Sequence, residues 1–405
     1  MAADETFVVV GAGHAGGRAV EAMRGAGFDG RIVLAGAESH LPYERPPLSK
    51  EVLAKDKDLA YCLTNPEDWY ADNRIEVMLS DPVRALDPGR HRVVLDSGRE
   101  VAYSRLLLAT GARVRRLGLP GDDLAGVHYL RAIDDALALR ADLREGARIV
   151  VVGGGFIGLE VAASARLRGC RVTVLESMPA LLGRVAAPGI AEHVEGVHRR
   201  NGVDVRTGVT VTALEGGPRV ERVVLANGEV LAADAVVVGI GVVPNVELAA
   251  AAGIETDNGV LVDEFCRASA PDVYAAGDVT NHYNPLLGKR MRLESWQNAQ
   301  NQAIAADKVM CGAEAPFAEV PWLWSDQFDL NLQIAGAGME ADETVSRENA
   351  DGFIVFQRSG GRLIGAIAVN RPRDMRAART LIAKRPDVPA ADLADPSIPL
   401  RKLIG

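Results

Sequence analysis

Glycines and one acid in the middle of the chain have the types and spacing needed to hold a dinucleotide. A G-x-G-x-x-G motif at residues 153–158 follows the apolar run 149–152, a helical pattern covers 156–168, and Glu176 follows a second apolar run at 171–175. The first glycine of such a motif permits a tight turn, the second admits a pyrophosphate, and the third lets helix and strand pack closely. Helix N-terminal amides would hold the phosphates and Glu176 the adenosine ribose, so we predict dinucleotide binding. The alternative is a glycine-lined turn in an ordinary α/β protein.

A second unit of the same kind opens the chain. An apolar strand is predicted at residues 6–10, a glycine motif at 11–16, a helix at 15–25 and a strand at 31–34. Glu38 follows that strand and is the predicted ribose acid.

The two units begin an internal repeat. Each is followed by a predicted β-hairpin and then by a buried strand that ends in glycine, at residues 91–102 and 106–111 in the first half and 220–231 and 236–241 in the second. Two dinucleotides side by side predict hydride or electron transfer between them. The P-loop that a helicase or kinase would carry is absent from the sequence. His14, inside the first motif, is predicted to be a structural loop residue.

Length and composition limit the number of domains and the classes of partner that the protein can have. A chain of 405 residues with 48% hydrophobic and 24% charged residues predicts two to three soluble domains. The net charge of −9 argues against nucleic acid as a partner. Neither a signal peptide nor an apolar run of membrane length is seen, so we expect a cytoplasmic protein that does not bind membranes.

The four cysteines are Cys62, Cys170, Cys266 and Cys311, and no two of them have C-x-x-C or C-x4-C spacing. This scatter excludes metal clusters of the usual spacing and a redox-active dithiol, so we predict no metal site. Small buried apolar residues are the remaining interpretation.

The segment YERPPLSK at residues 43–50 allows two interpretations. Its two prolines stiffen the backbone, and the residues after them can start a helix. The segment is then either a rigid element that places Arg45 and Lys50 near a cofactor or a proline-rich surface loop.

The last third of the chain contains one further cofactor candidate. A short strand at residues 273–276 ends at Gly277 and Asp278, where a carboxylate is well placed to meet a cofactor, and a helix follows at 295–310. From residue 321 onward no nucleotide motif occurs. A hairpin across 353–369 and an amphipathic helix at 373–383 predict a separate α+β domain there.

Seven motifs in order resemble the FAD-dependent NADH:ferredoxin reductases of bacterial oxygenase systems over essentially the whole chain. They are GAGHAG at 11–16, RPPLSK at 45–50, ATG at 109–111, GGGFIGLE at 153–160, GIGVVPN at 239–245, YAAGDV at 274–279 and WSDQ at 324–327. The resemblance implies an α/β fold with two Rossmann-like domains of the glutathione-reductase type and a C-terminal α+β domain. The FAD domain would be discontinuous, at 1–112 and 245–320, with the NAD domain at 113–244 and the C-terminal domain at 321–405.

The resemblance also implies the site residues. Those expected to hold FAD are Gly11, Gly13, Ala15, Gly16, Glu38, Arg45, Lys50, Val83, Thr110, Gly111, Arg131, Gly277, Asp278, Trp296 and Trp324. Those expected to hold NADH are Gly153, Gly155, Ile157, Gly158, Glu176, Arg184, Gly241 and Glu294. Many relatives carry an acid where this chain has Ala37, next to Glu38. Trp324 could instead be a core aromatic residue.

The implied reaction is that of an FAD-dependent NADH:ferredoxin oxidoreductase. NADH gives two electrons as hydride, a [2Fe–2S] ferredoxin accepts one, and flavin joins the two. The ferredoxin would supply a cytochrome P450 or a Rieske-type oxygenase. Lys50 and Glu160 are the catalytic candidates, as an ion pair beside the flavin that orders nicotinamide, with a plain structural salt bridge as the alternative.

Three further expectations concern specificity and partners. Glu176 would repel the extra phosphate of NADPH, which predicts a preference for NADH, although Arg184 could partly accommodate that phosphate. A basic patch could dock an acidic ferredoxin or be only a solvated helix face, and it contains Arg371, Arg373, Arg376, Arg379, Lys384 and Arg385. We expect a monomer or weak dimer.

Other activities of the same architecture are less consistent with the sequence. NADH oxidases, peroxidases and disulfide reductases use a cysteine beside the flavin, and none stands in the first helix or near Lys50. A rubredoxin reductase and a redox-responsive flavoprotein resembling the apoptosis-inducing factor remain as alternatives.

Overall fold

The computed structural model describes residues 5–183, 188–350 and 352–404, and the chain divides into two compact units. Unit 1 comprises Met1–Glu44, Leu59–Arg113 and Val243–Leu323, and unit 2 comprises Arg45–Asp58, Val114–Val242 and Trp324–Gly405. The segment with Arg45 and Lys50 therefore belongs to the same unit as the second glycine motif. The predicted division into three domains stays a prediction.

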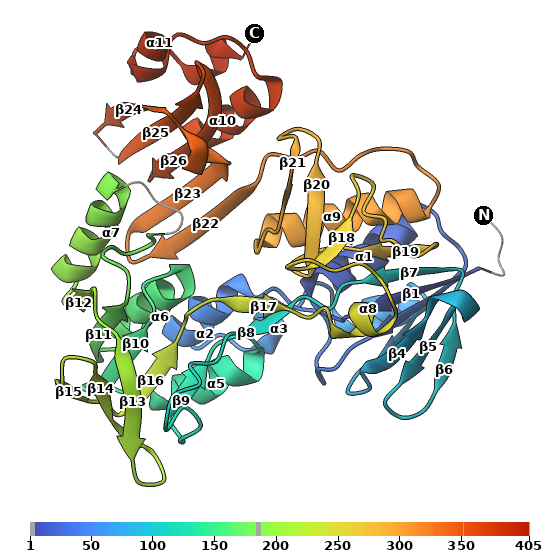
Figure 1. Ribbon diagram of the computed structural model, residues 1–405, viewed down its shortest axis with the longest axis horizontal. Helices are drawn as coiled ribbons and strands as arrows, with labels where there is room; N and C mark the ends of the chain where they lie inside the picture. The colour runs from blue at the N-terminus through green and yellow to red at the C-terminus, as the bar shows by residue number, and fades with distance from the viewer. Residues whose placement is uncertain (1–4, 184–187, 351, 405) are drawn as a thin grey trace. The chain divides into compact units, whose positions relative to one another are not determined.

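Unit 1 is built on a parallel five-stranded sheet with the order β19-β7-β1-β2-β3 (Figure 1). The strands are β1 (Thr6–Val10), β2 (Arg31–Ala35), β3 (Ile75–Met78), β7 (Arg105–Leu108) and β19 (Val273–Ala275). Phe7 and Val9 enter one hydrophobic core and Val8 and Val10 enter another, and all four are buried. A strand buried on both faces explains why this stretch reads as a continuous apolar run.

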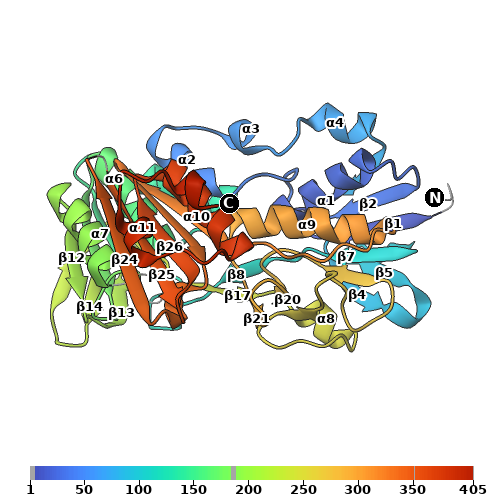
Figure 2. The same cartoon turned by 90° about the horizontal axis from the view of Figure 1, so that it is seen from above.

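Each face of the unit 1 sheet has its own cover. Helices α1 (His14–Gly25) and α9 (Trp296–Met310) pack against each other over one face, as Figures 1 and 2 show. The other face shares a core with an antiparallel sheet made of β4 (Val83–Asp87), β5 (Arg92–Leu95) and β6 (Glu100–Ala102). This layering leaves the carboxyl ends of the parallel strands as the edge where a ligand can bind.

Unit 2 repeats this plan with the strand order β12-β11-β10-β16-β9, again parallel. The strands are β9 (Val127–Tyr129), β10 (Arg148–Val152), β11 (Arg171–Glu176), β12 (Asp204–Thr207) and β16 (Ala235–Val238). Helix α6 (Phe156–Leu167) packs on β10 and β11. An antiparallel sheet of β13 (Val211–Gly216), β14 (Val220–Leu225) and β15 (Val230–Ala232) shares a core with the parallel sheet.

The C-terminal part of unit 2 is a five-stranded sheet with the order β22-β23-β26-β25-β24. Its strands are β22 (Trp322–Gln327), β23 (Leu330–Gly336), β24 (Glu343–Asn349), β25 (Gly352–Ser359) and β26 (Arg362–Val369). Helix α10 (Pro372–Lys384) packs on β23 and β26 and buries Met375, Ala378, Leu381 and Ile382 (Figure 2). The predicted hairpin is confirmed as β25 and β26, but the sequence pattern missed the three strands around it.

The remaining helices and strands complete the described chain. The helices are η1 (Pro46–Ser49), α2 (Glu51–Ala54), α3 (Leu59–Cys62), α4 (Glu67–Asp72), η2 (Pro88–Arg90), α5 (Ile133–Asp142), α7 (Pro188–Arg200), α8 (Glu247–Ala251), η3 (Gly338–Glu340), α11 (Ala390–Ala394) and η4 (Leu400–Leu403). The strands are β8 (Ala112–Val114), β17 (Val242–Pro244), β18 (Val260–Val262), β20 (Thr280–Asn284) and β21 (Lys289–Met291).

Candidate functional site: two dinucleotide loops and a buried ion pair

The first glycine motif forms a turn that only glycine fits. Gly11 has a φ of +116°, and a Cβ there would lie 2.2 Å from the Ala109 carbonyl oxygen. A Cβ at Gly16 would lie 1.9 Å from the Gly11 carbonyl oxygen, so side chains are excluded where α1 passes over β1. Helix α1 begins at His14 with the extended Gly13 as its N-cap, and no side-chain cap or acid occupies its first turn. Its amide donors therefore point out of the turn with a partial positive charge that suits a phosphate.

The second motif has the same geometry. Gly153 has a φ of +109°, and a Cβ at Gly158 would lie 2.1 Å from the Gly153 carbonyl oxygen. Helix α6 is likewise capped by a glycine, Gly155, without a side-chain cap or an acid in its first turn. A Cβ at Gly155 would meet no described protein atom closer than 3.9 Å, so packing within the described chain does not require this glycine. The predicted role of Gly155, to admit the pyrophosphate of a dinucleotide close to the backbone, would account for a glycine at this position.

The two predicted ribose acids are held in different ways. Glu176 at the end of β11 accepts hydrogen bonds from the amides of Gly154 and Met178, each at 2.7 Å. These bonds fix its carboxylate beside the glycine loop, where a ribose would lie. Glu38 lies three residues beyond β2 and accepts a hydrogen bond from the Tyr43 hydroxyl.

Other predicted NADH residues are found in different parts of the chain. Ile157 follows Gly155 in α6 and is 45% exposed, which leaves its side chain open to a ligand over the loop. Gly241 has a φ of +104° and lies just after β16 in unit 2. Glu294 belongs to unit 1, where it pairs with Arg292. Arg184 lies outside the described residues.

The ends of β7 and β19 carry the predicted FAD residues of unit 1. Thr110 donates its hydroxyl to the Asn245 carbonyl oxygen at 2.9 Å, and the Asn245 side-chain amide donates to the Thr110 carbonyl oxygen at 2.8 Å. The buried Gln302 of α9 accepts a hydrogen bond from the Gly277 amide at 2.9 Å, just before Asp278. Asn245 and Gln302 thus position the predicted residues, and sequence reasoning missed both because their bonds span 135 and 25 residues.

Three more predicted FAD residues of unit 1 lie within this framework. Val83 is the first residue of β4, and Gly111, with a φ of +64°, follows Thr110. Trp296 begins α9 and stacks on His14, with ring centroids 5.2 Å apart. The prediction of a loop residue at position 14 is wrong, because His14 begins α1 and is buried against this ring. A structural role for His14 agrees with that contact.

The remaining predicted FAD residues belong to unit 2. Arg45 donates to the Arg131 carbonyl oxygen, and the Arg131 amide donates to Asp135, which also caps the start of α5. Trp324 Nε1 donates to Asp326 at 3.1 Å on β22.

The segment after Arg45 is a pinned element of unit 2. Leu48 and Ser49 are each only 2% exposed, and the 3₁₀ turn η1 and helix α2 pack on α5 and α6. The Ser164 hydroxyl of α6 donates to the Ser49 carbonyl oxygen at 2.6 Å. The alternative of a surface loop is therefore wrong for this stretch, and Lys50 is presented by a fixed backbone.

Lys50 and Glu160 form a buried ion pair. Lys50 Nζ lies 2.9 Å from Glu160 Oε2, and the two side chains are 15% and 3% exposed. The Ser49 hydroxyl donates to Oε2 of Glu160 and the Ser325 hydroxyl donates to Oε1 at 2.6 Å. Both carboxylate oxygens are thus satisfied by donors, which offsets the loss of hydration. The predicted pairing is present; its place beside a flavin stays a prediction.

The cysteines do not suit thiol chemistry. Burial raises the pKa of Cys311 to about 12 and also raises the pKa of Cys170 and Cys266. A nucleophilic cysteine needs a lowered pKa and access to solvent. Cys62 is 1% exposed and Cys266 is 1% exposed as well, so neither offers an accessible thiolate.

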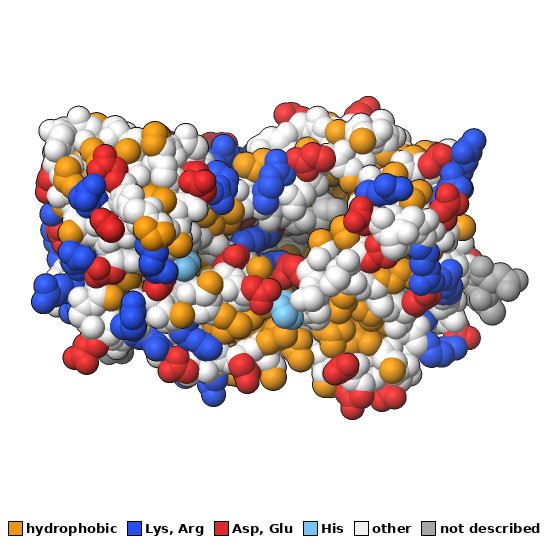
Figure 3. All heavy atoms as spheres, turned by 90° about the horizontal axis from the view of Figure 1, so that it is seen from below, with side chains coloured by type: hydrophobic (Ala, Val, Ile, Leu, Met, Phe, Trp, Pro, Cys, Tyr) orange, Lys and Arg blue, Asp and Glu red, His pale blue; other side chains and the backbone are white. Residues whose placement is uncertain are grey.

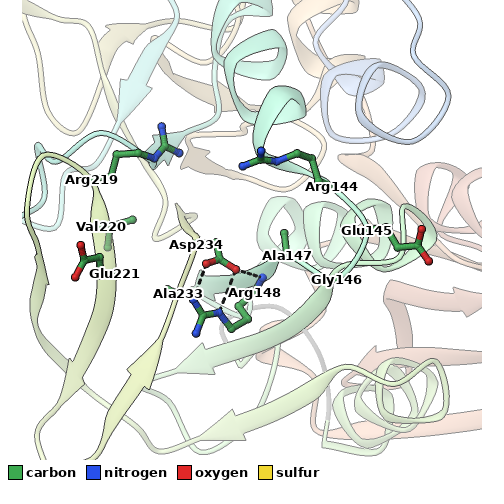
Figure 4. Close-up of a pocket in the computed structure, with 10 residues that line it drawn as sticks. All are labelled: Arg144, Glu145, Gly146, Ala147, Arg148, Arg219, Val220, Glu221, Ala233 and Asp234. Carbon is green, nitrogen blue, oxygen red and sulfur yellow. Dashed lines mark hydrogen bonds and ion pairs between the residues drawn. The ribbon is translucent and has the colours of Figure 1, made fainter.

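A surface hollow of about 590 Å³ in unit 2 is a poor candidate for the nucleotide site. Figure 4 shows that Arg148 and Asp234 pair at its floor, where β10 begins, with Nη2 and Oδ1 2.6 Å apart. This is the amino end of the parallel strands, whereas dinucleotides bind at the carboxyl end. Its other lining residues are Arg144, Glu145, Gly146, Ala147, Arg219, Val220, Glu221 and Ala233.

Comparison with known proteins identifies the family. The profile of the pyridine nucleotide-disulphide oxidoreductases matches residues 5–303, and a reductase C-terminal profile matches residues 322–404. The ferredoxin–NAD(+) reductase component of an anthranilate 1,2-dioxygenase system from Burkholderia cepacia is 45% identical over 407 residues, covering 100% of both chains. The chain belongs to this ferredoxin reductase family. Members use FAD and NAD(H), so this oxidoreductase does too.

Further relatives agree with the family assignment over nearly the full length. Rhodocoxin reductase from Rhodococcus erythropolis is 41% identical over 404 residues, which covers 98% of this chain and 94% of that one. The solved covalent complex of putidaredoxin reductase with putidaredoxin contains a chain that superposes with a TM-score of 0.96 at 36% identity, covering 100% of this reductase and 99% of that chain. Across the described residues, no helix has the length and apolar character to cross a membrane.

Proposed function

We propose that this protein is an NADH:ferredoxin reductase that supplies single electrons to a [2Fe–2S] ferredoxin of a bacterial oxygenase system. The observation that supports this most is the full-length similarity to reductase components that carry both the nucleotide-binding part and the reductase C-terminal part. FAD, when bound, supplies the conversion between the two-electron chemistry of NADH and the one-electron chemistry of an iron–sulfur protein. The terminal oxygenase would be a Rieske-type dioxygenase or a cytochrome P450.

In this proposal the first glycine motif, in unit 1, binds FAD. The α1 amides after Gly11, Gly13 and Gly16 bind its pyrophosphate, and Glu38 binds its ribose. Ala15, at the start of α1, leaves space beside them because its side chain is small. The rest of the FAD set is proposed from the family resemblance and contains Arg45, Lys50, Val83, Thr110, Gly111, Arg131, Gly277, Asp278, Trp296 and Trp324.

Unit 2 holds NADH through the loop of Gly153, Gly155 and Gly158. The proposed role of Glu176 is to accept hydrogen bonds from the adenosine ribose, since its carboxylate is already aligned by two backbone amides. The same carboxylate would repel the 2′-phosphate of NADPH, so we expect kcat/KM to be at least about tenfold higher with NADH. Equal or better use of NADPH would contradict this role. Ile157, Arg184, Gly241 and Glu294 complete the proposed NADH set.

Lys50 and Glu160 are proposed to order the nicotinamide. The pair fixes a positive charge in a largely buried place, and the neighbouring hydroxyls prevent its carboxylate from turning. Lys50 donates one N–H to Glu160 and one to the Pro46 carbonyl oxygen. Among the described contacts, its third N–H remains available to a bound group.

The basic surface of α10 is the proposed docking site for an acidic ferredoxin. Arg371 pairs with Asp374, while Arg373 and Arg376 are exposed. The face drawn in Figure 3 instead mixes acidic and basic side chains, which offers less steering to a partner of one sign. Charge reversal at Arg376 and Arg379 should raise the ferredoxin KM at low salt, and an unchanged KM would contradict this surface.

A coupled assay with purified candidate ferredoxins and either NADH or NADPH tests the function. We expect NADH-dependent reduction of at least one ferredoxin by a yellow, FAD-containing protein. Rapid reduction of rubredoxins alone would favour the rubredoxin reductase alternative. Slow turnover with every acceptor, together with a change of oligomeric state on reduction, would favour the redox-responsive flavoprotein. A cytoplasmic location and a monomeric or weakly dimeric state remain part of the proposal.

A further inference from the structure

A line of buried polar side chains joins Glu160 to His198 within unit 2. Ser325 Oγ lies 2.6 Å from Glu160 Oε1, Gln327 Nε2 lies 2.9 Å from Ser325 Oγ, and His198 Nε2 lies 2.8 Å from Gln327 Oε1. The four residues are 3%, 0%, 1% and 0% exposed. Because they come from α6, β22 and α7, the line connects three elements that are far apart in the sequence.

The donors in this line can point in only one direction. Glu160 pairs with Lys50 as a carboxylate, so it accepts from Ser325, whose single hydroxyl proton is then used. Ser325 Oγ can then only accept a hydrogen bond from Gln327, so the side-chain N–H of Gln327 must face it. The Gln327 oxygen then faces His198, so His198 must carry its proton on Nε2. Every donor therefore points toward the negative charge of Glu160.

The surroundings of His198 keep its ring neutral. Among the described residues its Nδ1 has no hydrogen-bond partner, and the ring packs edge-on against Phe328 with centroids 5.3 Å apart. Burial lowers the pKa of His198, and the bond to Gln327 opposes this only in part. A neutral ring with its one proton on Nε2 is the form that the Gln327 oxygen requires.

Strand geometry explains why Ser325 and Gln327 share this role. Alternate residues of a strand point to opposite faces, so Ser325 and Gln327 are buried together while Asp326 between them is exposed. The W-S-D-Q motif thus contributes two buried polar side chains as well as Trp324.

We propose that Ser325, Gln327 and His198 form a one-way hydrogen-bond relay that positions the Glu160 carboxylate against Lys50. They are positioning residues, since they act through Glu160. The inference rests on the proposed function only for its kinetic consequence, because the relay itself is a property of the folded chain. Serine fixes the orientation of the glutamine amide, and the amide fixes the tautomer of the histidine.

The test is Ser325→Ala in the FAD-loaded protein, with ¹⁵N NMR of the His198 ring as the first readout. We expect a single Nε2–H tautomer in the native protein and a mixture in the variant, because the Gln327 amide is then free to turn over. A plain packing role for Ser325 would leave the tautomer two residues further along the relay unchanged. An unchanged His198 tautomer in Ser325→Ala would therefore overturn the relay.

Rapid-mixing kinetics of flavin reduction by NADH are the second readout. Loss of the Ser325 hydroxyl should slow the limiting rate roughly three- to tenfold and leave the apparent NADH Kd within about twofold, because Glu160 loses one hydrogen bond but keeps Lys50 and Ser49 as partners. Ser325→Thr, which keeps the hydroxyl, should restore most of the rate. Equal rates in Ser325→Ala and the native protein would overturn the positioning role.

Variants at the far end of the relay keep the proposal falsifiable if Ser325→Ala folds poorly. His198→Gln can still donate an N–H to the Gln327 oxygen, whereas His198→Phe cannot, so only the phenylalanine variant should slow reduction. His282→Phe is the matched control: His282 is also buried, and among the described residues neither ring nitrogen has a hydrogen-bond partner. Slowing of similar size in His282→Phe would count against the relay.

These outcomes separate the relay from the proposed function. If no ferredoxin is reduced while the tautomer and the NADH-dependent rate respond as expected, the proposed function fails and the relay stands. If a ferredoxin is reduced while neither readout responds to Ser325→Ala, the relay fails and the function stands.

Discussion

Four of the five strands follow the same order in the two nucleotide-binding sheets, yet the two units place their candidate acids differently beside the glycine loop. Parallel pairing aligns Val10 with Ala35 in unit 1 and Val152 with Leu175 in unit 2, so Gly36 and Glu176 occupy matching positions. In unit 1 a Cβ at Gly36 would lie 2.5 Å from the Ala12 Cβ.

In unit 2 the matching loop residue is Gly154, and its amide bonds Glu176 instead. A methyl group on the loop therefore excludes an acid from the strand end, and the candidate acid of unit 1 comes later, at Glu38. A small steric difference in each loop thus decides where the carboxylate stands.

The same helix position carries opposite charges in the two units. Arg18 and Glu160 each follow the first glycine of their motif by seven residues. Arg18 is 20% exposed and pairs with Glu21 and Glu44, whereas Glu160 is 3% exposed and pairs with Lys50. Burial turns an ordinary surface ion pair into one whose disruption is costly.

The fifth strand of each sheet comes from a different place in the sequence relative to the repeated unit. Unit 1 takes β19 from about 165 residues after β7, and unit 2 takes β9 from before β10. Asp278 follows β19 and Arg131 follows β9, so the predicted cofactor residues at this edge have opposite charges. A repeated sequence pattern therefore does not imply a repeated site.

The largest expected effect is that alanine in one glycine motif should abolish FAD binding, whereas alanine in the other should impair only the reaction with NADH. Gly16→Ala places a Cβ 1.9 Å from a carbonyl oxygen, so the purified protein should lose FAD and its yellow colour. Gly158→Ala meets the same clash at 2.1 Å in unit 2, and it should keep FAD but lose at least about a hundredfold in reduction by NADH. Flavin absorbance and stopped-flow reduction measure the two effects. Loss of FAD from Gly158→Ala with retention in Gly16→Ala would reverse the assignment.

The second prediction compares the ion pair with a buried carboxylate, Lys50 and Glu160, with the ion pairs of Arg18, whose carboxylates are partly exposed. Lys50→Met leaves the Glu160 carboxylate buried without its partner and should reduce the free energy of unfolding by about 3–5 kcal/mol. Arg18→Met should cost under about 1 kcal/mol, because its partners Glu21 and Glu44 are 42% and 30% exposed and stay hydrated without it. Urea unfolding of both variants measures the difference, and the double variant Lys50→Met with Glu160→Gln should recover much of the stability. Equal costs for Lys50→Met and Arg18→Met would contradict the role of burial.

The two units should also respond to pH with opposite signs. Burial raises the pKa of Asp307 in α9 from 3.8 to about 7, so the folded state holds a proton that the unfolded state has lost between these values. Stability should then fall as pH rises from about 4 to 7, and Asp307→Asn should remove a fall of a few kcal/mol, at about 1.4 kcal/mol per unit of pKa shift. Urea unfolding at pH 5 and pH 8 checks this.

Asp234 in unit 2 provides the contrast. Its hydrogen bonds to Arg148 lower its pKa to about 2, so its contribution is present above about pH 4 and is lost as pH falls through about 2. The side chain is 41% exposed, and Asp234→Asn should cost under about 1 kcal/mol. The stability of Asp234→Asn should fall between pH 5 and pH 8 by as much as that of the native protein. Such a result would show that Asp234 does not cause this fall and would leave its assignment to Asp307 intact.

The last prediction tests whether the side chains at positions 12 and 36 compete for one space beside the glycine loop of unit 1. Gly36→Ala should cost about 1–3 kcal/mol because its Cβ meets Ala12, and Ala12→Gly in the same chain should return most of that loss. Thermal unfolding of the two single variants and the double variant measures the coupling. Additive losses would show that the two side chains do not compete for one space.

Local spacing alone predicted the parts of the fold that depend on neighbouring residues. The glycine motifs, the strands before them and the helices after them were confirmed in both units, because turn geometry and hydrophobic period are local properties. The short strands β3 and β12 and most of the C-terminal sheet were missed. Half-buried strands with charged residues have a weak pattern, and only their pairing partners stabilise them.

The sequence by itself predicted that this chain holds two dinucleotides and, through its resemblance, that it is a ferredoxin reductase, with Lys50 and Glu160 as the proposed catalytic pair. Only the tertiary structure decided which groups hold that pair, because Ser49 and Ser325 bond Glu160 across 111 and 165 residues of sequence. It likewise showed that His198, which no motif singles out, lies at the end of a buried relay. Such contacts depend on how helices and strands pack, and packing brings together residues whose separation along the chain carries no pattern.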